Sequence, residues 1–251
     1  MRIIELSKGL WNIYKPKRVT SFDVVRGIKK MTGEQKVGHA GTLDPLAEGV
    51  LVVGIGREAT KKLRFVLEED KEYIAEIKLG MNSETDDEEG VKSSHFAEAT
   101  RDKKVKSRMS KVKDIWPSLE EVEKIVEAFV GDIVQVSPVY SAIKIGGERA
   151  YKKARRREKF TRPPRIVTIK EIEILDYQLK DFEKIEQENN DTIPAGKYPV
   201  LKIRCVVGSG TYIRSLAREI GEKLETGGYL ISLVRIRIGD YKIKEAINLK
   251  N

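Results

Sequence analysis

Residues 36–56 read KVGHAGTLDPLAEGVLVVGIG, a polar loop followed by an apolar run. Glycine and other turn-forming residues dominate positions 36–49, so no regular structure is expected there. The VLVVGI run at 50–55 is continuously apolar and has the length of a buried strand. The sequence therefore predicts a polar loop against a buried strand, which is a common place for a functional site.

Apolar patterns in the rest of the chain predict strands and helices in irregular alternation. Strands are expected at 10–14, 50–55, 71–80, 166–175, 200–207 and 229–238, and helices from Thr20 or Ser21 to Gly33, from Ser118 to Gly131 and at 212–225. The alternation in 71–80 turns Tyr73 inward. Because the pattern lacks the regular βαβ order of a Rossmann sheet, the expected class is α+β, with a mixed, largely antiparallel sheet flanked by helices.

The length of 251 residues fits one catalytic domain covering 1–251. Between 84 and 117 the periodicity breaks down, and an acidic run gives way to a basic run. This composition predicts an exposed, mobile insertion.

The net charge of +9, with charged residues at 35% of the chain, favours a polyanionic partner. A solvated, lysine-rich surface of a heat-adapted protein is the alternative. The single Cys205 lies in an alternating, strand-like segment and is expected in the core. No leader sequence or membrane-spanning run is recognisable, so a cytoplasmic protein without a membrane partner is expected, as a monomer.

Several site types have no signature in the sequence. His39, His95 and Cys205 are too far apart to form a zinc motif of recognisable spacing. No phosphate-binding loop or dinucleotide fingerprint is present. Catalysis without a metal or cofactor is therefore expected.

Asp44 stands in the densest cluster of turn-forming and reactive residues, GHAGTLDP at 38–45. A carboxylate on a glycine-rich turn can be held rigidly and presented to a ligand, because glycine permits close approach and Pro45 restricts the backbone. The alternative is that Asp44 is only a turn residue before proline.

Arg214 ends the segment GTYIR at 210–214, which opens the predicted helix, and lies in its first turn. A cation is unfavourable at the positive end of the helix dipole, so a carboxylate partner is expected to compensate it. A surface arginine without a fixed partner is the alternative.

Nine Lys or Arg residues and one acid lie between Arg149 and Arg165, with Tyr151 and Phe160 interleaved. Such runs are often solvated surfaces, but this composition also suits binding of an RNA backbone with base stacking. The candidates for backbone contacts are Lys152, Arg155 and Arg156.

Taken together, these segments resemble the TruB family of tRNA pseudouridine synthases. The matching pieces are YKPKRVTSFDVV at 14–25, KVGHAGTLDPLAEGVLVVGIG at 36–56, KEYIAEIKLG at 71–80, DEEG at 87–90, SPVYSAIKIGGERAYKKAR at 137–155, RPPR at 162–165, GSGTYIRSLAREIG at 208–221 and LVRIRIG at 233–239. The resemblance covers most of the chain outside the insertion and residues 178–198. It implies the pseudouridine synthase catalytic fold and isomerisation of uridine 55 in the T arm of tRNA.

The resemblance also implies roles for single residues. Asp44 matches the nucleophile that attacks the target uridine, by routes through ribose or base that use the same residues. Tyr73 matches the tyrosine that stacks under the flipped base and is implicated in removing the proton from carbon 5, and Arg214 matches the arginine that pairs with the aspartate. His39 matches a residue that helps displace the nucleotide, while Tyr212 and Leu233 match residues that line the pocket.

Two departures from the family affect the expected partners. About a dozen residues follow the last matched strand, so the C-terminal RNA-binding PUA domain of many relatives is not expected. The basic run at 149–165, together with the basic half of the insertion, is expected to supply some of the affinity for the T stem-loop. The insertion is also longer than the family pattern. The alternatives are a guide-dependent or ribosomal RNA synthase, a non-catalytic RNA-binding or RNA-folding module, and a glycosidase, although no second acid accompanies Asp44 in a matched motif.

Overall fold

The computed structural model describes residues 6–94, 116–187 and 192–249. The chain folds into two compact units. Unit 1 comprises Met1–Ile74, Arg204–Gly210 and Ser232–Asn251, and unit 2 comprises Ala75–Ile203 and Thr211–Ile231. The strands β4 (Lys71–Leu79), β13 (Gly196–Val207) and β14 (Gly228–Ile238) contribute residues to both units.

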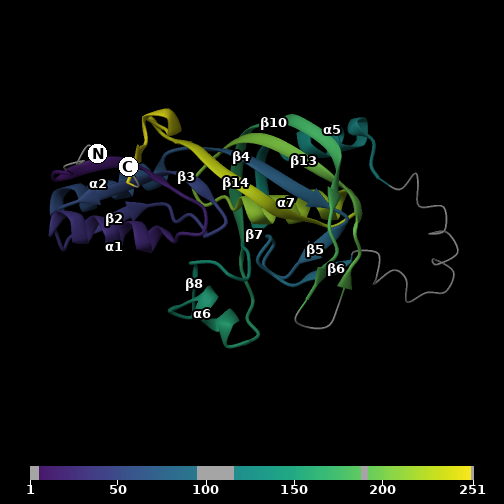
Figure 1. Cartoon of the computed structure of the whole chain (residues 1–251), viewed down its shortest axis with the longest axis horizontal. Helices are drawn as coiled ribbons and strands as arrows, with labels where there is room; N and C mark the ends of the chain where they lie inside the picture. The colour runs from purple at the N-terminus through teal and green to yellow at the C-terminus, as the bar shows by residue number, and fades with distance from the viewer. Residues whose placement is uncertain (1–5, 95–115, 188–191, 250–251) are drawn as a thin grey trace, which may run out of the picture. The chain divides into compact units, whose positions relative to one another are not determined.

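Ten strands form the main sheet, in the order β16-β1-β3-β14-β4-β13-β10-β7, with β2 on β3 and β15 on β14. The remaining members are β1 (Gly9–Lys15), β2 (Val37–Ala40), β3 (Glu48–Ile55), β7 (Gly131–Val136), β10 (Pro164–Phe182), β15 (Tyr241–Lys242) and β16 (Ile247–Asn248). Figure 1 labels β2, β3, β4, β7, β10, β13 and β14 of this sheet. The pairs β1·β16 and β14·β3 are parallel, whereas β1·β3, β2·β3, β7·β10 and β14·β15 are antiparallel. The expected α+β class with a mixed, largely antiparallel sheet is confirmed.

Short hairpins and helices complete the described part of the chain. The hairpins are β5 (Met81–Ser83) with β6 (Lys92–Ser94), β8 (Lys144–Ile145) with β9 (Glu148–Arg149), and β11 (Ile185–Glu186) with β12 (Thr192–Ile193). The helices are α1 (Ser21–Thr32), α2 (Arg57–Glu68), α5 (Leu119–Glu127), α6 (Ala150–Arg155), α7 (Ile213–Lys223) and the 3-10 turn η2 (Ile243–Glu245).

In unit 1, both faces of β3 are buried. Leu51 and Val53 pack with Ile28 of α1 in one apolar cluster. Val50 and Val52 point the other way and pack with Leu63, Val66 and Ala40. The continuous apolar run at 50–55 follows from this double burial, because each successive side chain meets one of the two clusters.

Helix boundaries follow local capping chemistry. Thr20 caps α1 in a reciprocal capping box with Asp23, and Gly33 ends it at φ 69°, a left-handed conformation that favours glycine. Ser118 caps α5 in the same way with Glu121. These predicted caps are confirmed, although α5 ends at Glu127 and Gly131 already begins β7.

Other sequence expectations need correction. Residues 37–40 were expected to be irregular, but they form β2, because pairing with β3 supplies hydrogen bonds that local composition does not reveal. Helix α2 had not been predicted, and residues 137–157, for which no strand or helix was expected, contain the β8–β9 hairpin and α6. Strand β10 extends to Phe182, beyond the expected end at 175.

The acidic half of the predicted insertion is partly buried. Asp86 and Asp87 lie in the turn between β5 and β6 and are only 8% and 3% exposed, so the expectation of an exposed segment is wrong for these two residues. Residues 95–115 lie outside the described residues.

Lys78 of β4 is fully buried in unit 2. Its Nζ lies 3.7 Å from the ring centroid of Phe182 and 4.2 Å from that of Tyr198, and it has no hydrogen-bond partner among the described residues. Burial is the main reason why the pKa of Lys78 falls to about 8. The two aromatic faces partly replace the lost hydration of the ammonium.

Replacing Lys78 with methionine is expected to raise the free energy of unfolding at pH 7 by on the order of 1 kcal/mol, because the buried ammonium disappears while the apolar stem remains. In the parent chain, the folded-state pKa of about 8 lies below the unfolded value of 10.5, so this lysine's destabilising effect is relieved as pH rises from 8 to 10.5. In Lys78→Met, the part of the rise in stability with pH that is due to Lys78 should be absent.

Urea unfolding at pH 7 and pH 9.5 measures both effects. Exposed Lys197→Met is the matched control and should change neither value. Some pH dependence should remain in Lys78→Met, because burial also lowers the pKa values of Lys15 and Lys71 to about 8. A Lys78→Met protein less stable than the parent at pH 7 would contradict the explanation.

Candidate active site

Asp44 lies in the loop between β2 and β3 of unit 1 and is partly buried. The loop leaves β2 through Gly41, whose φ of 71° is accessible to glycine at little cost. The carbonyl of Asp44 accepts a hydrogen bond of 3.0 Å from the Ala47 amide, which closes the turn. A short, internally bonded turn therefore carries the carboxylate.

Residues at the start of α1 and just before it fix the middle of this loop. The buried hydroxyl of Ser21 donates to the Leu43 carbonyl at 3.0 Å and accepts from the Leu43 amide at 2.9 Å. The Arg18 amide donates to the Pro45 carbonyl at 2.8 Å. Both residues that flank Asp44 are thus bonded to the same segment, which restricts the position of its backbone.

Lys15 provides a buried positive charge that interacts with Asp44. It is fully buried, and its Nζ donates to the carbonyls of Pro16 at 2.9 Å and Val19 at 2.6 Å. Burial lowers its pKa to about 8, and the negative charges of Asp44 and Glu48 oppose this change. Lys15 is therefore mainly protonated at pH 7, where its charge favours a carboxylate at Asp44.

His39 lies in β2 opposite Val53. Burial, followed by the positive charge of Arg235, lowers the pKa of His39 below its usual value of 6.5. The imidazole is consequently neutral at pH 7. Its Nδ1 is buried and has no hydrogen-bond partner within the described ranges.

Tyr73 and Leu233 are both buried, at 8% and 7% exposure. The inward orientation expected for Tyr73 is confirmed by its burial alongside Ala75 in β4. Leu233 belongs to β14, which lies between β3 and β4 in the sheet. Neighbouring strands of the sheet therefore carry Tyr73, Leu233 and the residues that directly follow the Asp44 loop.

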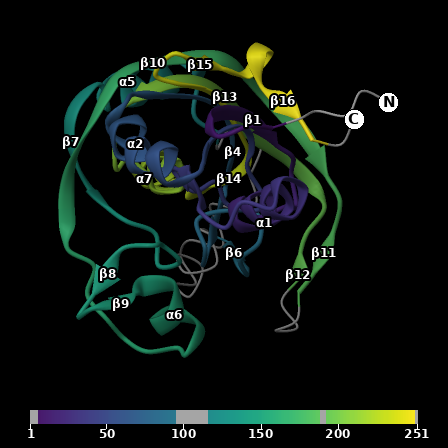
Figure 2. The same ribbon diagram turned by 90° about the vertical axis from the view of Figure 1, so that its left-hand side faces the viewer.

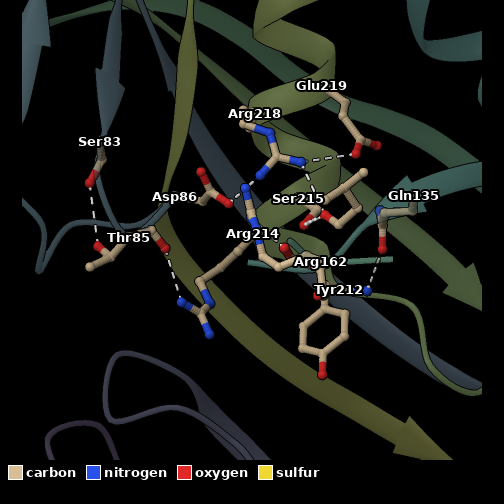
Figure 3. Close-up of polar contacts among 12 residues, drawn as sticks. Ser83, Thr85, Asp86, Gln135, Arg162, Tyr212, Arg214, Ser215, Arg218 and Glu219 are labelled. Atoms are coloured by element: carbon tan, nitrogen blue, oxygen red, sulfur yellow. Dashed lines mark hydrogen bonds and ion pairs between the residues drawn. The ribbon is translucent and has the colours of Figure 1, made fainter. Parts of the chain in front are cut away.

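Arg214 is buried in the first turn of α7 in unit 2, with Tyr212 at the N-cap position (Figure 3). Its Nη1 donates to the Thr85 carbonyl at 2.9 Å and lies 3.3 Å from Oδ2 of Asp87, and its Nη2 donates to the Tyr140 carbonyl at 2.8 Å. The predicted compensation by a carboxylate is confirmed with Asp87 as a partner. The alternative of a surface arginine is wrong.

Other polar groups surround this turn of α7. The Tyr212 amide donates to Oε1 of Gln135 at 2.8 Å, and the Ser215 hydroxyl donates to the Val136 carbonyl at 2.8 Å (Figure 3). Arg218, one turn further along, pairs with Asp86. Burial raises the pKa of Asp86 although the charges of Arg218 and Arg214 oppose the change.

The expected site residues divide between the two units. Asp44, His39, Tyr73 and Leu233 belong to unit 1, whereas Tyr212 and Arg214 belong to unit 2. The pairing of Asp44 with Arg214 therefore stays a prediction of the resemblance.

The basic run begins at Arg149, the last residue of β9, and continues through α6, which lies next to the β8–β9 hairpin in Figure 2. Lys152 and Arg155 are exposed on α6, and the Arg155 guanidinium lies 5.7 Å from the centroid of the Tyr151 ring. Arg156 differs from them, because it donates to both oxygens of Glu148 at 2.8 and 2.6 Å and to Glu158 at 2.6 Å. Arg156 is also exposed, but its charge is largely compensated by these two carboxylates of the same chain.

No cluster of three or more potential metal ligands occurs among the described residues. In the same residues, no helix is both long enough and apolar enough to cross a membrane.

The chain matches a known protein family over most of its length. The model of the TruB family pseudouridylate synthases, N-terminal domain, matches residues 29–213, a range that includes the Asp44 loop and reaches the start of α7. The chain belongs to the TruB family.

Curated relatives support the same assignment. The chain is 40% identical over 244 residues to tRNA pseudouridine synthase B of Clostridium tetani, covering 97% of this chain and 72% of the relative. It is 38% identical to the enzyme of that name from Francisella philomiragia, covering 97% and 69%. The relative from Leifsonia xyli is 36% identical, with 97% and 71% covered.

Solved structures show the same fold. A chain in the crystal structure of a Cbf5-Nop10-Gar1 complex matches with a TM-score of 0.63 and 28% identity, covering 96% of this chain and 52% of that chain. A chain of an H/ACA RNP bound to a substrate RNA containing 2′-deoxyuridine matches with a TM-score of 0.59 and 25% identity, covering 96% and 51%. The present chain thus spans about half the length of these two solved chains.

Sequence reasoning did not identify Asp87 as a partner of Arg214, because the charge run at 84–89 suggested an exposed segment. The DEEG turn was a usable signal, since it recurs in the family resemblance and begins at Asp87. The loop contacts of Ser21 and Arg18 were also missed, although both lie in another matching segment, 14–25.

Asp86 allows the effect of its charge to be separated from that of its backbone conformation. Its φ is 60°, which asparagine tolerates and alanine does not. The raised pKa means that ionised Asp86 is less favourable in the folded chain than in the unfolded chain. Asp86→Asn is therefore expected to stay within about 1 kcal/mol of the parent, while Asp86→Ala should lose a further 1–2 kcal/mol, approximately the left-handed backbone penalty.

Urea unfolding at pH 7 compares the two variants, with exposed Glu84→Gln in the same turn as control. Repeating the urea unfolding at lower pH tests the direction in which Asp86 makes stability depend on pH. Stability contributed by Asp86 should fall as pH rises through its raised pKa in the parent, but not in Asp86→Asn. Equal losses in the Asn and Ala variants would count against this account.

Proposed function

We propose that the protein converts uridine 55 in the T arm of tRNA to pseudouridine, with Asp44 as the nucleophile. The observation that carries the proposal is the anchored Asp44 loop in a chain of this family, with bonds to the residues on each side of Asp44. The relatives named tRNA pseudouridine synthase B support tRNA as the substrate.

The reaction is an isomerisation. The bond between C1′ of the ribose and N1 of uracil breaks, the base rotates, and a bond between C1′ and C5 forms. C5 loses a proton and N1 gains one, so the product contains the same atoms and electrons as the substrate. A carboxylate that attacks the nucleotide divides this rearrangement into a detachment step and a reattachment step.

The target uridine must leave its stack before a side chain can reach it, at a cost of a few kcal/mol. In the proposed mechanism, His39 helps to displace the nucleotide, and its neutral imidazole is suited to packing and hydrogen bonding rather than to donating a proton at pH 7. Tyr73 stacks under the base and takes part in removing the C5 proton, and Tyr212 and Leu233 line the pocket. Arg214 pairs with Asp44 and is itself held by Asp87.

Release of tritium from tRNA labelled at C5 of uridine tests the proposal. The parent chain should release one equivalent for each tRNA, and Asp44→Asn should release none while still binding tRNA, because only the nucleophile is removed. Asp240→Asn, an exposed change in unit 1, is the matched control and should retain full activity.

Replacing uridine 55 by cytidine in the tRNA should abolish release. Conversion of tRNA by the purified chain alone would also exclude dependence on a guide RNA. Binding without release by the parent chain would instead indicate a non-catalytic RNA-binding module and would overturn the proposed activity.

The exposed cations of α6 are proposed to bind the tRNA backbone. Lys152→Gln with Arg155→Gln should weaken tRNA binding and reduce the slope of log K against log salt by about 0.7–0.9 for each phosphate that the variant no longer neutralises. Arg156→Gln should change the slope less, because Glu148 and Glu158 already compensate its charge. Binding titrations between about 50 and 200 mM salt measure these slopes. An unchanged slope in the double variant would eliminate this surface as an RNA-binding surface.

A further inference from the structure

Arg235 is among the largest fully buried side chains of the described structure, with 1% exposure. It lies in β14, which runs parallel to β3 and aligns Arg235 with Gly49. Its Nε donates to the Val50 carbonyl at 2.8 Å, and its Nη2 donates to the Gly41 carbonyl at 2.8 Å. A single guanidinium therefore connects β3 to the first residue of the Asp44 loop.

Gly41, the first residue of the loop, and Gly49, the second residue of β3, both fit closely against Arg235. A Cβ on Gly41 would lie 3.2 Å from Nη1 of Arg235, and a Cβ on Gly49 would lie 2.2 Å from the Arg235 carbonyl oxygen. The side chain of Arg235 thus lies against the start of the loop and its backbone against the start of β3. Neither segment can move far without disturbing the same residue.

The residue type at 235 also needs an explanation. Burying a charged group is costly unless its donors are bonded, and the interior of a strand is ordinarily filled by apolar side chains. Arginine has a planar fork of donors that can bond two carbonyls in fixed directions, whereas lysine offers a single nitrogen. The nearness of this charge to the site is evident in the lowered pKa values of His39 and Lys15, to which it contributes.

We propose that Arg235 is a positioning residue, which holds the Gly41 carbonyl and so fixes the loop that presents the Asp44 carboxylate. It acts through the backbone and does not touch the substrate. Ser21 and Arg18 hold the middle of the loop, and Arg235 holds its entry. The inference rests on the proposed role of Asp44 as nucleophile.

Arg235→Lys keeps the charge but removes the fork, and Arg237→Lys is a matched control in the same strand. Arg237 is bonded to Glu72 at 2.7 Å and to the Gly239 carbonyl at 3.2 Å rather than to the Asp44 loop. Single-turnover tritium release with enzyme in excess measures the chemical step. Titration measures tRNA affinity, and thermal unfolding measures the folded fraction at the assay temperature.

Arg235→Lys is expected to slow the single-turnover rate about 10- to 100-fold, since a displacement of about 1 Å can cost that much. Its tRNA dissociation constant should stay within about twofold of the value for Arg237→Lys, which should react at nearly the parent rate. An unchanged rate in folded Arg235→Lys would overturn the proposal. So would a rate loss that the folded fraction or the affinity fully accounts for.

Gly41→Ala provides a second route if Arg235→Lys does not fold, because the added methyl group would lie 3.2 Å from Nη1 of Arg235 at a left-handed φ, so the contact between the guanidinium and the start of the loop must shift. A slowed rate with unchanged tRNA affinity is again the expected result, and an unchanged rate refutes the proposal. Failure of the proposed function looks different, because then the parent chain itself releases no tritium or Asp44→Asn still does.

Discussion

The burial of both faces of β3 is the constraint on which unit 1 depends. Helix α1 contributes to the cluster on one face and α2 to the cluster on the other, while β1, β2 and β14 hydrogen-bond along the strand. Packing on both faces and pairing with neighbouring strands together restrict the position of β3. The loop that leads into β3 at Glu48 is therefore anchored at that end, and its buried residues Leu43 and Ala47 help a short turn to place the partly buried carboxylate of Asp44 reproducibly.

In unit 2, the buried guanidinium of Arg214 has a comparable influence. A cation in the first turn of a helix is opposed by the helix dipole, and its burial removes hydration as well. The surrounding fold supplies two carbonyls and the carboxylate of Asp87, which belongs to the β5–β6 turn. The contacts with Arg214 therefore restrict the conformation of that turn. The turn also contains Asp86 at a positive φ, which is unfavourable for a residue other than glycine.

The sequence predicted features that depend on neighbouring residues. The capping boxes at Thr20 and Ser118, the alternation that buries Tyr73 and the polar turn at Asp44 each involve a few consecutive positions. Strand β2 and the ion pair of Asp87 were missed because each depends on a partner remote in sequence. Arg235 left a weak signal, an arginine within an apolar strand, but which carbonyls it bonds is decided only when β14 aligns with β3.

The passage of β4, β13 and β14 through both units has a consequence for dissecting the molecule. Unit 1 is assembled from three separate stretches of chain and unit 2 from two. No single cut in the backbone can release either unit as an intact fragment, and no contiguous gene segment encodes one alone. Exchanging either unit between relatives would therefore need more than one recombination junction.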